Sequence, residues 1–155
     1  MTNRTVPNRV RGSDDRRRVL DSNNAHRLAQ RATVARLIGH YHFGPTIDPV
    51  SIVWSGSRVY FYAEGRSRLG WSALDSSVVL EVDAEDDAHL TVSTVVIHGI
   101  ARAVVDARLE VLEQLLPRPH SDGPPMHRLV EVTPTSVSGV ELMRGPTAGE
   151  TNSRG

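Results

Sequence analysis

Short stretches of alternating apolar and polar residues recur along the chain, and this two-residue period is typical of half-buried β-strands. The stretches are rich in valine, isoleucine, threonine and aromatic residues, so we predict a strand in each of them. The predicted strands cover Thr33–Tyr41, Thr46–Trp54, Arg58–Tyr62, Ser77–Asp83, Leu90–Val105, Arg128–Thr133 and Ser136–Met143, the last two forming either a pair or one bent strand. Ser55-Gly56-Ser57 is a predicted hairpin turn, and Gly99 marks a bulge or bend.

Three segments instead have the period of a helix: Ser22–Arg31 with a cap at Asp21 or Ser22, Ser67–Leu74, and Asp106–Leu116, which Pro117 ends. Most of the predicted strands are consecutive and joined by tight turns. We therefore expect a mainly β fold with short helices, namely a six-stranded antiparallel barrel with two or three peripheral helices. A parallel, doubly wound sheet is less compatible with this order of elements.

The 155 residues are enough for one domain with a buried core. We expect this domain to span residues 19–144, between a disordered arm at 1–18 and a polar, disordered tail at 145–155. The arm contains three consecutive arginines, Arg16 to Arg18, but Asp14 and Asp15 precede them. We therefore interpret the arginines as part of a solvated tail and not as a nucleic-acid contact.

Composition narrows the possible functions. The net charge is zero, and no apolar run is long enough for a membrane span, so we expect no nucleic acid and no membrane as partners. The start of the chain lacks the apolar core of a signal peptide, which makes the cytoplasm the expected location. The chain has no cysteine, and all 18 basic residues are arginine, which excludes thiolate catalysis and a lysine Schiff base.

A basic, glycine-punctuated turn is the strongest candidate for a binding site. Gly65-Arg66-Ser67-Arg68-Leu69 follows a predicted strand and opens a predicted short helix. Backbone N–H groups at a helix start attract anions, and arginine adds a forked donor that is always charged. The turn therefore suits a phosphate, although an ordinary solvated turn has the same composition.

The order of these segments resembles that of the FMN-binding split-barrel superfamily, the pyridoxamine 5'-phosphate oxidase-like flavoproteins, and in particular its small actinobacterial members. Segments that carry the resemblance are Ala32 to Leu37, Pro45 to Trp54, Val59 to Leu69, Val79 to Asp83 and Val95 to Ala101. The resemblance covers about Arg27 to Arg144. It implies a split β-barrel, a homodimer with the site between the two subunits, and an oxidoreductase that acts on a small organic molecule.

The resemblance also implies which residues contact the FMN. By position in the family pattern, Arg66, Ser67 and Arg68 would hold the phosphate, and Pro49, Val50 and Ser51 would present backbone to the isoalloxazine ring. Tyr62 and Thr94 would lie near the ring or the ribityl chain, and Trp71 and Trp54 have apolar faces that suit a ring pocket. No catalytic acid or base is implied, because the flavin itself carries the redox chemistry.

Two alternatives remain open. A deazaflavin-dependent reductase would use the same basic turn for its cofactor. A cofactor-free relative with a binding role or a repurposed biosynthetic role is the other, because Ala63, Leu69, Ser93 and Val140 depart from the family pattern. We expect no metal site, since His40 and His42 have no further ligand at a suitable spacing.

Overall fold

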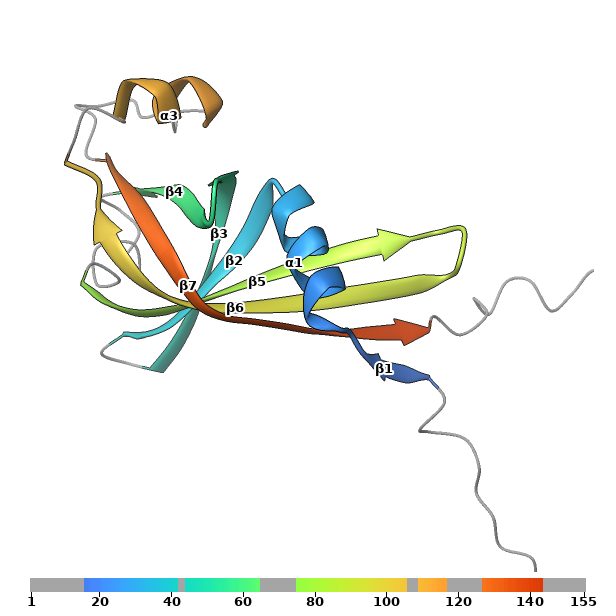
Figure 1. Cartoon of the computed structure of the whole chain (residues 1–155). Helices are drawn as coiled ribbons and strands as arrows, with labels where there is room; N and C mark the ends of the chain where they lie inside the picture. Colours follow the sequence, from blue (N-terminus) through green and yellow to red (C-terminus); the bar gives the residue numbers. More distant parts are fainter. Residues whose placement is uncertain (1–15, 42–43, 65–74, 106–108, 117–126, 144–155) are drawn as a thin grey trace, which may run out of the picture.

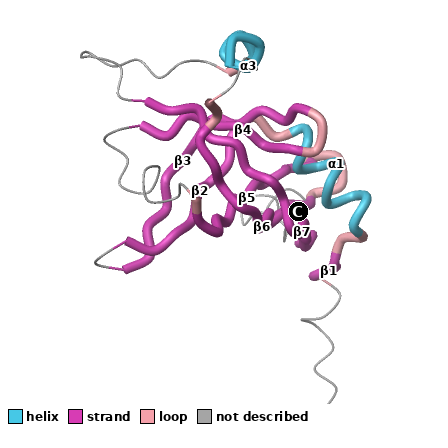
Figure 2. The backbone as a smooth tube through the Cα atoms, turned by 60° about the vertical axis from the view of Figure 1, so that its left-hand side comes forward, coloured by secondary structure: helices cyan, strands magenta, loops and turns pink. Residues whose placement is uncertain are grey.

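The computed structural model describes residues 16–41, 44–64, 75–105, 109–116 and 127–143. Along the chain its elements are β1 (Arg17–Val19), α1 (Ser22–Arg31), β2 (Val34–Tyr41), β3 (Gly44–Ser55), β4 (Arg58–Glu64), β5 (Ser76–Asp86), β6 (Thr91–Ala103), α3 (Leu109–Leu115) and β7 (His127–Met143). The strands cross one another in a twisted arrangement, with the two helices at different sides of it (Figures 1 and 2).

Six antiparallel strands form a closed ring in the order β7-β4-β3-β2-β5-β6, and β6 pairs again with β7. The short strand β1 adds to the far end of β7, where Arg18 lies opposite Glu141. This arrangement confirms the predicted mainly β, six-stranded antiparallel fold with peripheral helices. Closure of the ring leaves every long strand hydrogen-bonded on both flanks over part of its length.

Helix α1 begins where the sequence predicts. The side chain of Asp21 caps it, because Oδ1 accepts a hydrogen bond from the Asn24 N–H at 2.9 Å. The helix buries Ala25 and Ala29 in the main core and lies next to β6 and β7. These two alanines are four residues apart, so they share one face, and their small side chains let the helix approach the strands closely.

The main core fills the inside of the ring. Alternate residues of each strand point inward, and Phe61, Leu37, Leu80 and Ile97 are fully buried there. A second, smaller cluster lies on the other face of β4. It consists of Tyr60, Tyr62, Leu112, Leu116 and Leu129, with Val53 and Val104 at its edge. This second cluster attaches α3 to the outside of the ring.

The structure also settles several details of the sequence prediction. The two predicted strands at the end of the chain are one continuous strand, β7. It carries a bulge, because His98 pairs with Ser136 and Gly99 with Pro134, which leaves Thr135 as an extra residue. Gly56 occupies the first central position of the β3–β4 turn with a φ of 61°. Strand β1 begins within the expected arm, and the predicted helix Ser67–Leu74 lies outside the described residues.

Candidate functional site

Arg36 lies at the centre of a polar network on the outer face of the ring. Its Nη1 donates to Glu81 Oε1 at 2.8 Å and to Asp83 Oδ2 at 2.6 Å. Thr94 Oγ1 donates to the other carboxylate oxygen of Asp83 at 2.7 Å. The contacts join β2, β5 and β6, because Arg36 pairs with Glu81 in register and Asp83 pairs with Thr94.

The contacts of this network favour the charged forms of Asp83 and Arg36. Partial burial raises the pKa of Asp83, but the hydrogen bonds from Thr94 and Arg36 and the positive charge of Arg36 outweigh it, so the pKa lies below its ordinary value. The hydrogen bond to Asp83 and the charge of that carboxylate raise the pKa of Arg36. Two carboxylates therefore face one guanidinium, and the network carries one net negative charge.

Three of the predicted flavin contacts share this outer face. Pro49 lies opposite Arg36 in the β2–β3 register, and Ser51 lies opposite Val34. Both Pro49 and Ser51 are exposed, whereas Val50 between them points inward and packs against the main core. Ser51 and Thr94 are separated by three strand spacings, about 14 Å. The structure thus brings Pro49, Ser51 and Thr94 to one surface.

Two other aromatic candidates point elsewhere. Tyr62 is 7% exposed and lies in the second cluster beneath α3, where its ring meets that of His127 edge-on at 5.1 Å between centroids. Trp54 is half-buried against the main core. Its Nε1 is buried and has no hydrogen-bond acceptor among the described residues. An unpaired indole N–H of this kind is one of the few unsatisfied groups in the described core.

The phosphate-binding candidates Arg66, Ser67 and Arg68 and the ring-pocket candidate Trp71 lie outside the described residues, as does Leu69. Their chain neighbour Glu64 ends β4 and pairs with His127 at the beginning of β7. The role of the Gly65–Leu69 turn as a phosphate site stays a prediction.

The departures from the family pattern differ in where they lie. Ala63 is part of the main core. Ser93 is also buried, and it points inward on the same face of β6 as Val95. Val140 pairs with Thr94 and belongs to the outer face. Of the three described departures, only Val140 is on the same surface as Pro49, Ser51 and Thr94.

Arg36, Glu81 and Asp83 are the part of this site that sequence reasoning missed. A signal existed, because Glu81 and Asp83 occupy alternate positions of a strand and so must share a face. Their contact with Arg36 depends on the pairing of β5 with β2, which are not consecutive in the chain.

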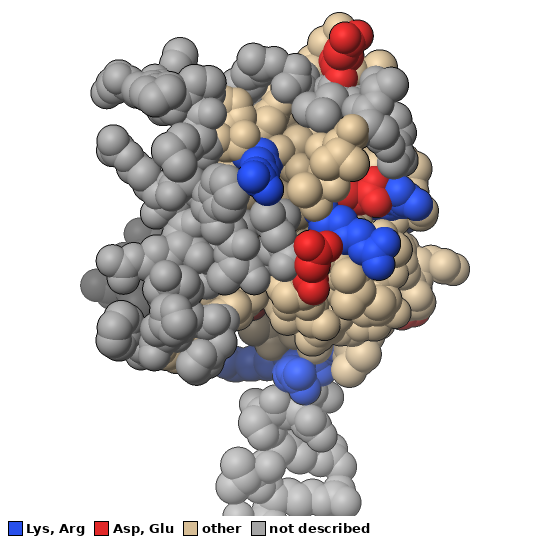
Figure 3. Space-filling model, turned by 90° about the vertical axis from the view of Figure 1, so that its left-hand side faces the viewer, with Lys and Arg blue, Asp and Glu red and all other residues tan. Residues whose placement is uncertain are grey.

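On the side of the molecule shown in Figure 3, arginine and acidic side chains of the described residues are interspersed.

Within the described segments, no group of three or more histidine, aspartate or glutamate side chains is arranged to hold a metal ion. Likewise, none of the described helices has the length and apolar character that crossing a membrane requires.

The fold and site together define the class of protein: a small, closed antiparallel β-ring with one helix packed into the core and a polar network on its outer face. A family model described as pyridoxamine 5'-phosphate oxidase matches residues 21–141. The chain therefore belongs to that family, as the sequence resemblance predicted. Among curated proteins, no sequence matches the chain.

Solved structures share the fold. The FAD-binding protein from Mycobacterium smegmatis is 21% identical, with a TM-score of 0.63 over 81% of this chain and 98% of the other. A FAD-binding protein from Mesorhizobium loti is 18% identical, with a TM-score of 0.64 over 81% of this chain and 97% of the other. A conserved protein of unknown function from Corynebacterium diphtheriae is 27% identical, with a TM-score of 0.63 over 83% of this chain and 100% of the other.

Proposed function

We propose that this chain binds a flavin nucleotide, FMN, and acts as a cytoplasmic oxidoreductase on a small organic substrate. Family membership supports the proposal, and so do the names of two similar structures, which are FAD-binding proteins. The observation that carries it is the shared outer face of Pro49, Ser51 and Thr94, which lie far apart in the sequence. The flavin supplies the redox chemistry, and the protein supplies binding and orientation.

The chain's own residues fit this role in a specific way. The Thr94 hydroxyl donates its hydrogen bond to Asp83, so its oxygen is left as an acceptor for a donor on the ligand. Asp83 is fixed in turn by Arg36, which keeps the threonine hydroxyl in one orientation. In this proposal Arg66, Ser67 and Arg68 neutralise the phosphate through charge-assisted hydrogen bonds.

We further propose that two copies of the chain meet at the outer face and that the flavin lies between them. Large apolar side chains are exposed there: Val34 and Ile47 are each 58% exposed, and Leu142 is 42% exposed. A mixed surface with an apolar part and a satisfied polar network is typical of a protein interface. A second copy would cover these side chains and enclose the ring of the flavin.

The test is the absorbance spectrum of the purified protein, followed by titration of the stripped protein with FMN, FAD and the deazaflavin coenzyme. We expect flavin absorbance near about 450 nm and tighter binding of FMN than of the other two. If FAD bound most tightly, the cofactor would be the one named for the similar FAD-binding structures. If the deazaflavin coenzyme bound most tightly, the chain would be a deazaflavin-dependent reductase.

The variant Arg66→Ala/Arg68→Ala should lose at least about tenfold in flavin affinity, because two charge-assisted contacts to the phosphate disappear. A matched control is Arg27→Ala/Arg31→Ala, which removes two exposed arginines from α1. Equal flavin affinity in both double variants would move the phosphate site elsewhere. No binding of any of the three cofactors by the unmodified chain would instead support a cofactor-free binding protein.

A further inference from the structure

Arg36 uses only part of its hydrogen-bonding capacity. Both of its ion-pair contacts, to Glu81 and to Asp83, come from one nitrogen, Nη1. A guanidinium has about five N–H donors in a planar fork, and Nη1 carries about two of them. Among the residues that the structure describes, neither Nη2 nor Nε of Arg36 has a hydrogen-bond acceptor. The remaining donors are therefore available to a ligand.

Two carboxylates determine where the free donors of Arg36 lie. Glu81 is opposite Arg36 in the β2–β5 register, and Asp83 follows two residues later on the same face of β5. Their oxygens lie 2.8 and 2.6 Å from Nη1, so the guanidinium is held from two sides although the side chain is 46% exposed. A donor that is already held in place loses little conformational freedom when a ligand binds.

Arg36 lies within the apolar part of the outer face. Exposed Pro49 is opposite it on β3. Val34 and Ile47 each precede one member of this pair by two residues on the same face, and each is 58% exposed. The proposed second copy would cover this part of the surface. Covering a guanidinium whose remaining donors have no acceptor costs free energy, so the covering group must bring an acceptor.

We propose that Arg36 donates hydrogen bonds to the pyrimidine edge of the bound flavin, whose carbonyl oxygens and ring nitrogen are acceptors. The network of Arg36, Glu81 and Asp83 then sets how tightly the reduced flavin is bound relative to the oxidised flavin. This inference rests on the proposed flavin site at Pro49 and Ser51. Charge near this edge of the ring is one of the means by which a protein tunes a flavin.

The direction of the effect follows from the charges. When two electrons and one proton are added, a flavin ring carries one more negative charge than in its oxidised form. The positive charge of Arg36 therefore favours the reduced flavin, and the negative charges of Glu81 and Asp83 disfavour it. Removing Arg36 and removing a carboxylate should shift the reduction potential of the bound flavin in opposite directions.

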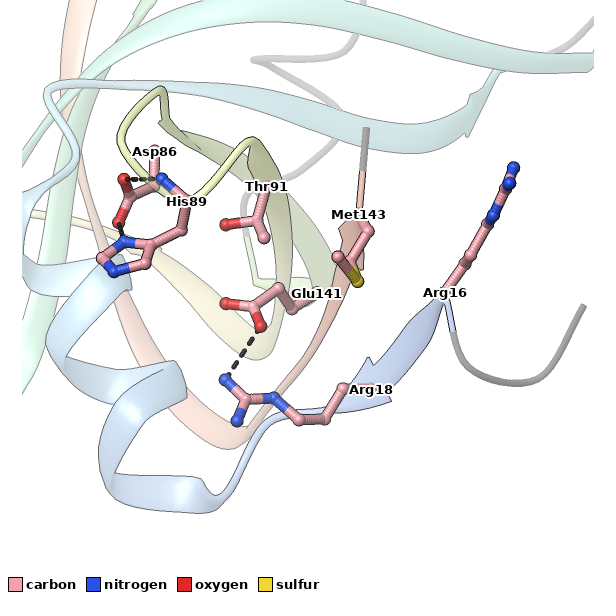
Figure 4. A pocket seen from close by; sticks show the side chains of 7 residues that line it. All are labelled: Arg16, Arg18, Asp86, His89, Thr91, Glu141 and Met143. Carbon is pink, nitrogen blue, oxygen red and sulfur yellow. Dashed lines mark hydrogen bonds and ion pairs between the residues drawn. The ribbon is translucent and has the colours of Figure 1, made fainter. Parts of the chain in front are cut away.

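The chain offers a matched ion pair on the other face of the sheet. Arg18 Nη2 lies 2.8 Å from Glu141 Oε1 at a pocket where β1, the end of β7 and the β5–β6 hairpin meet (Figure 4). Glu141 follows Val140, which belongs to the outer face, so the Glu141 side chain points to the opposite face. Variants of this pair change the same types of charge away from the proposed flavin contact.

The experiment measures the reduction potential of FMN bound to the full chain, by spectrophotometric titration against a reference dye. Arg36→Gln should weaken the binding of reduced relative to oxidised FMN by about tenfold, as expected for the loss of one nearby charge. For a two-electron couple this lowers the potential by about 30 mV. Glu81→Gln should raise the potential, because its amide oxygen still accepts from Arg36 while the negative charge is gone. Arg18→Gln and Glu141→Gln should each change the affinity ratio by less than about twofold, since solvent and salt screen the more distant charge.

Arg36→Lys separates the charge from the hydrogen bonds. Lysine keeps the positive charge without the planar fork, so the potential should stay close to that of the unmodified chain while oxidised FMN binds more weakly. If Arg36→Gln does not fold, Glu81→Gln decides the question alone, because the potential must rise.

Shifts in the same direction for Arg36→Gln and Glu81→Gln would show that the network only holds the strands together, and the inference would be wrong. An equally large shift for Arg18→Gln would also overturn it. If the unmodified chain binds FMN and none of the variants changes the potential, this inference alone fails. If the unmodified chain binds no flavin, the proposed function fails and this inference fails with it.

Discussion

At Gly99 the backbones of β6 and β7 approach each other too closely for any side chain. A Cβ atom at this position would lie 2.5 Å from Val132 Cγ1 and 2.8 Å from the Thr133 carbonyl oxygen. The extra residue Thr135 lies just beyond, where its hydroxyl donates to the His98 carbonyl at 3.2 Å. The glycine therefore permits the close approach on one side of the bulge, and the threonine hydroxyl satisfies a carbonyl on the other.

We predict that Gly99→Ala lowers the free energy of unfolding by about 1–3 kcal/mol, because the backbone oxygen of Thr133 cannot move away without disturbing the strand pairing. Urea denaturation of the variant and of the unmodified chain measures the difference. The control is Ser138→Ala, an exposed position on β7, which should change the free energy by less than about 0.5 kcal/mol. An unchanged midpoint for Gly99→Ala would contradict the close packing.

Among the secondary-structure elements, the network of Arg36, Asp83 and Thr94 connects three strands that are distant in sequence order. Its carboxylate gives the fold a testable dependence on pH. The folded state lowers the pKa of Asp83 below 3.8, so ionised Asp83 stabilises the fold above that pH. This contribution is lost as the pH falls through the lower, folded-state pKa.

We therefore expect the unmodified chain to be more stable than Asp83→Asn at neutral pH and the difference to vanish under strongly acidic conditions. Unfolding curves of both proteins between neutral pH and about pH 2 provide the measurement. Two stability profiles that remain parallel across the whole range would show that Asp83 gains nothing from Arg36 and Thr94.

The sequence predicted these elements well because their signals are local. The alternation of apolar and polar residues identified the strands. Asp21, which precedes an apolar stripe that contains two alanines, gave the exact first residue of α1. The pairing of β2 with β5 could not be read in the same way, because no local pattern specifies which non-consecutive strands meet. Arg36 therefore had no visible partner in the sequence, and Tyr62 could not be assigned to the face beneath α3 until Leu112 and Leu116 were placed.

For the molecule as a whole, the proposed pairing of two copies predicts a change in oligomeric state. Ile47→Glu places a charge among the exposed apolar side chains of the outer face and should convert a dimer to a monomer. Val111→Glu is the control, since Val111 is similarly exposed at 63%, compared with 58% for Ile47, but lies on α3. Light scattering after size-exclusion chromatography reports the molar mass. Dissociation by the control alone would place the interface on α3 instead.

Strand β7 has one further consequence for how the chain reaches this structure. It pairs with β4 and β1 on one flank and with β6 on the other. Without β7, the other five long strands would form an open sheet whose edges, β4 and β6, expose rows of unpaired N–H and C=O groups. Such edges are templates for the strands of neighbouring molecules. Variants that loosen β7 should therefore be lost through aggregation of partly folded chains, even where the completed ring is only slightly weakened.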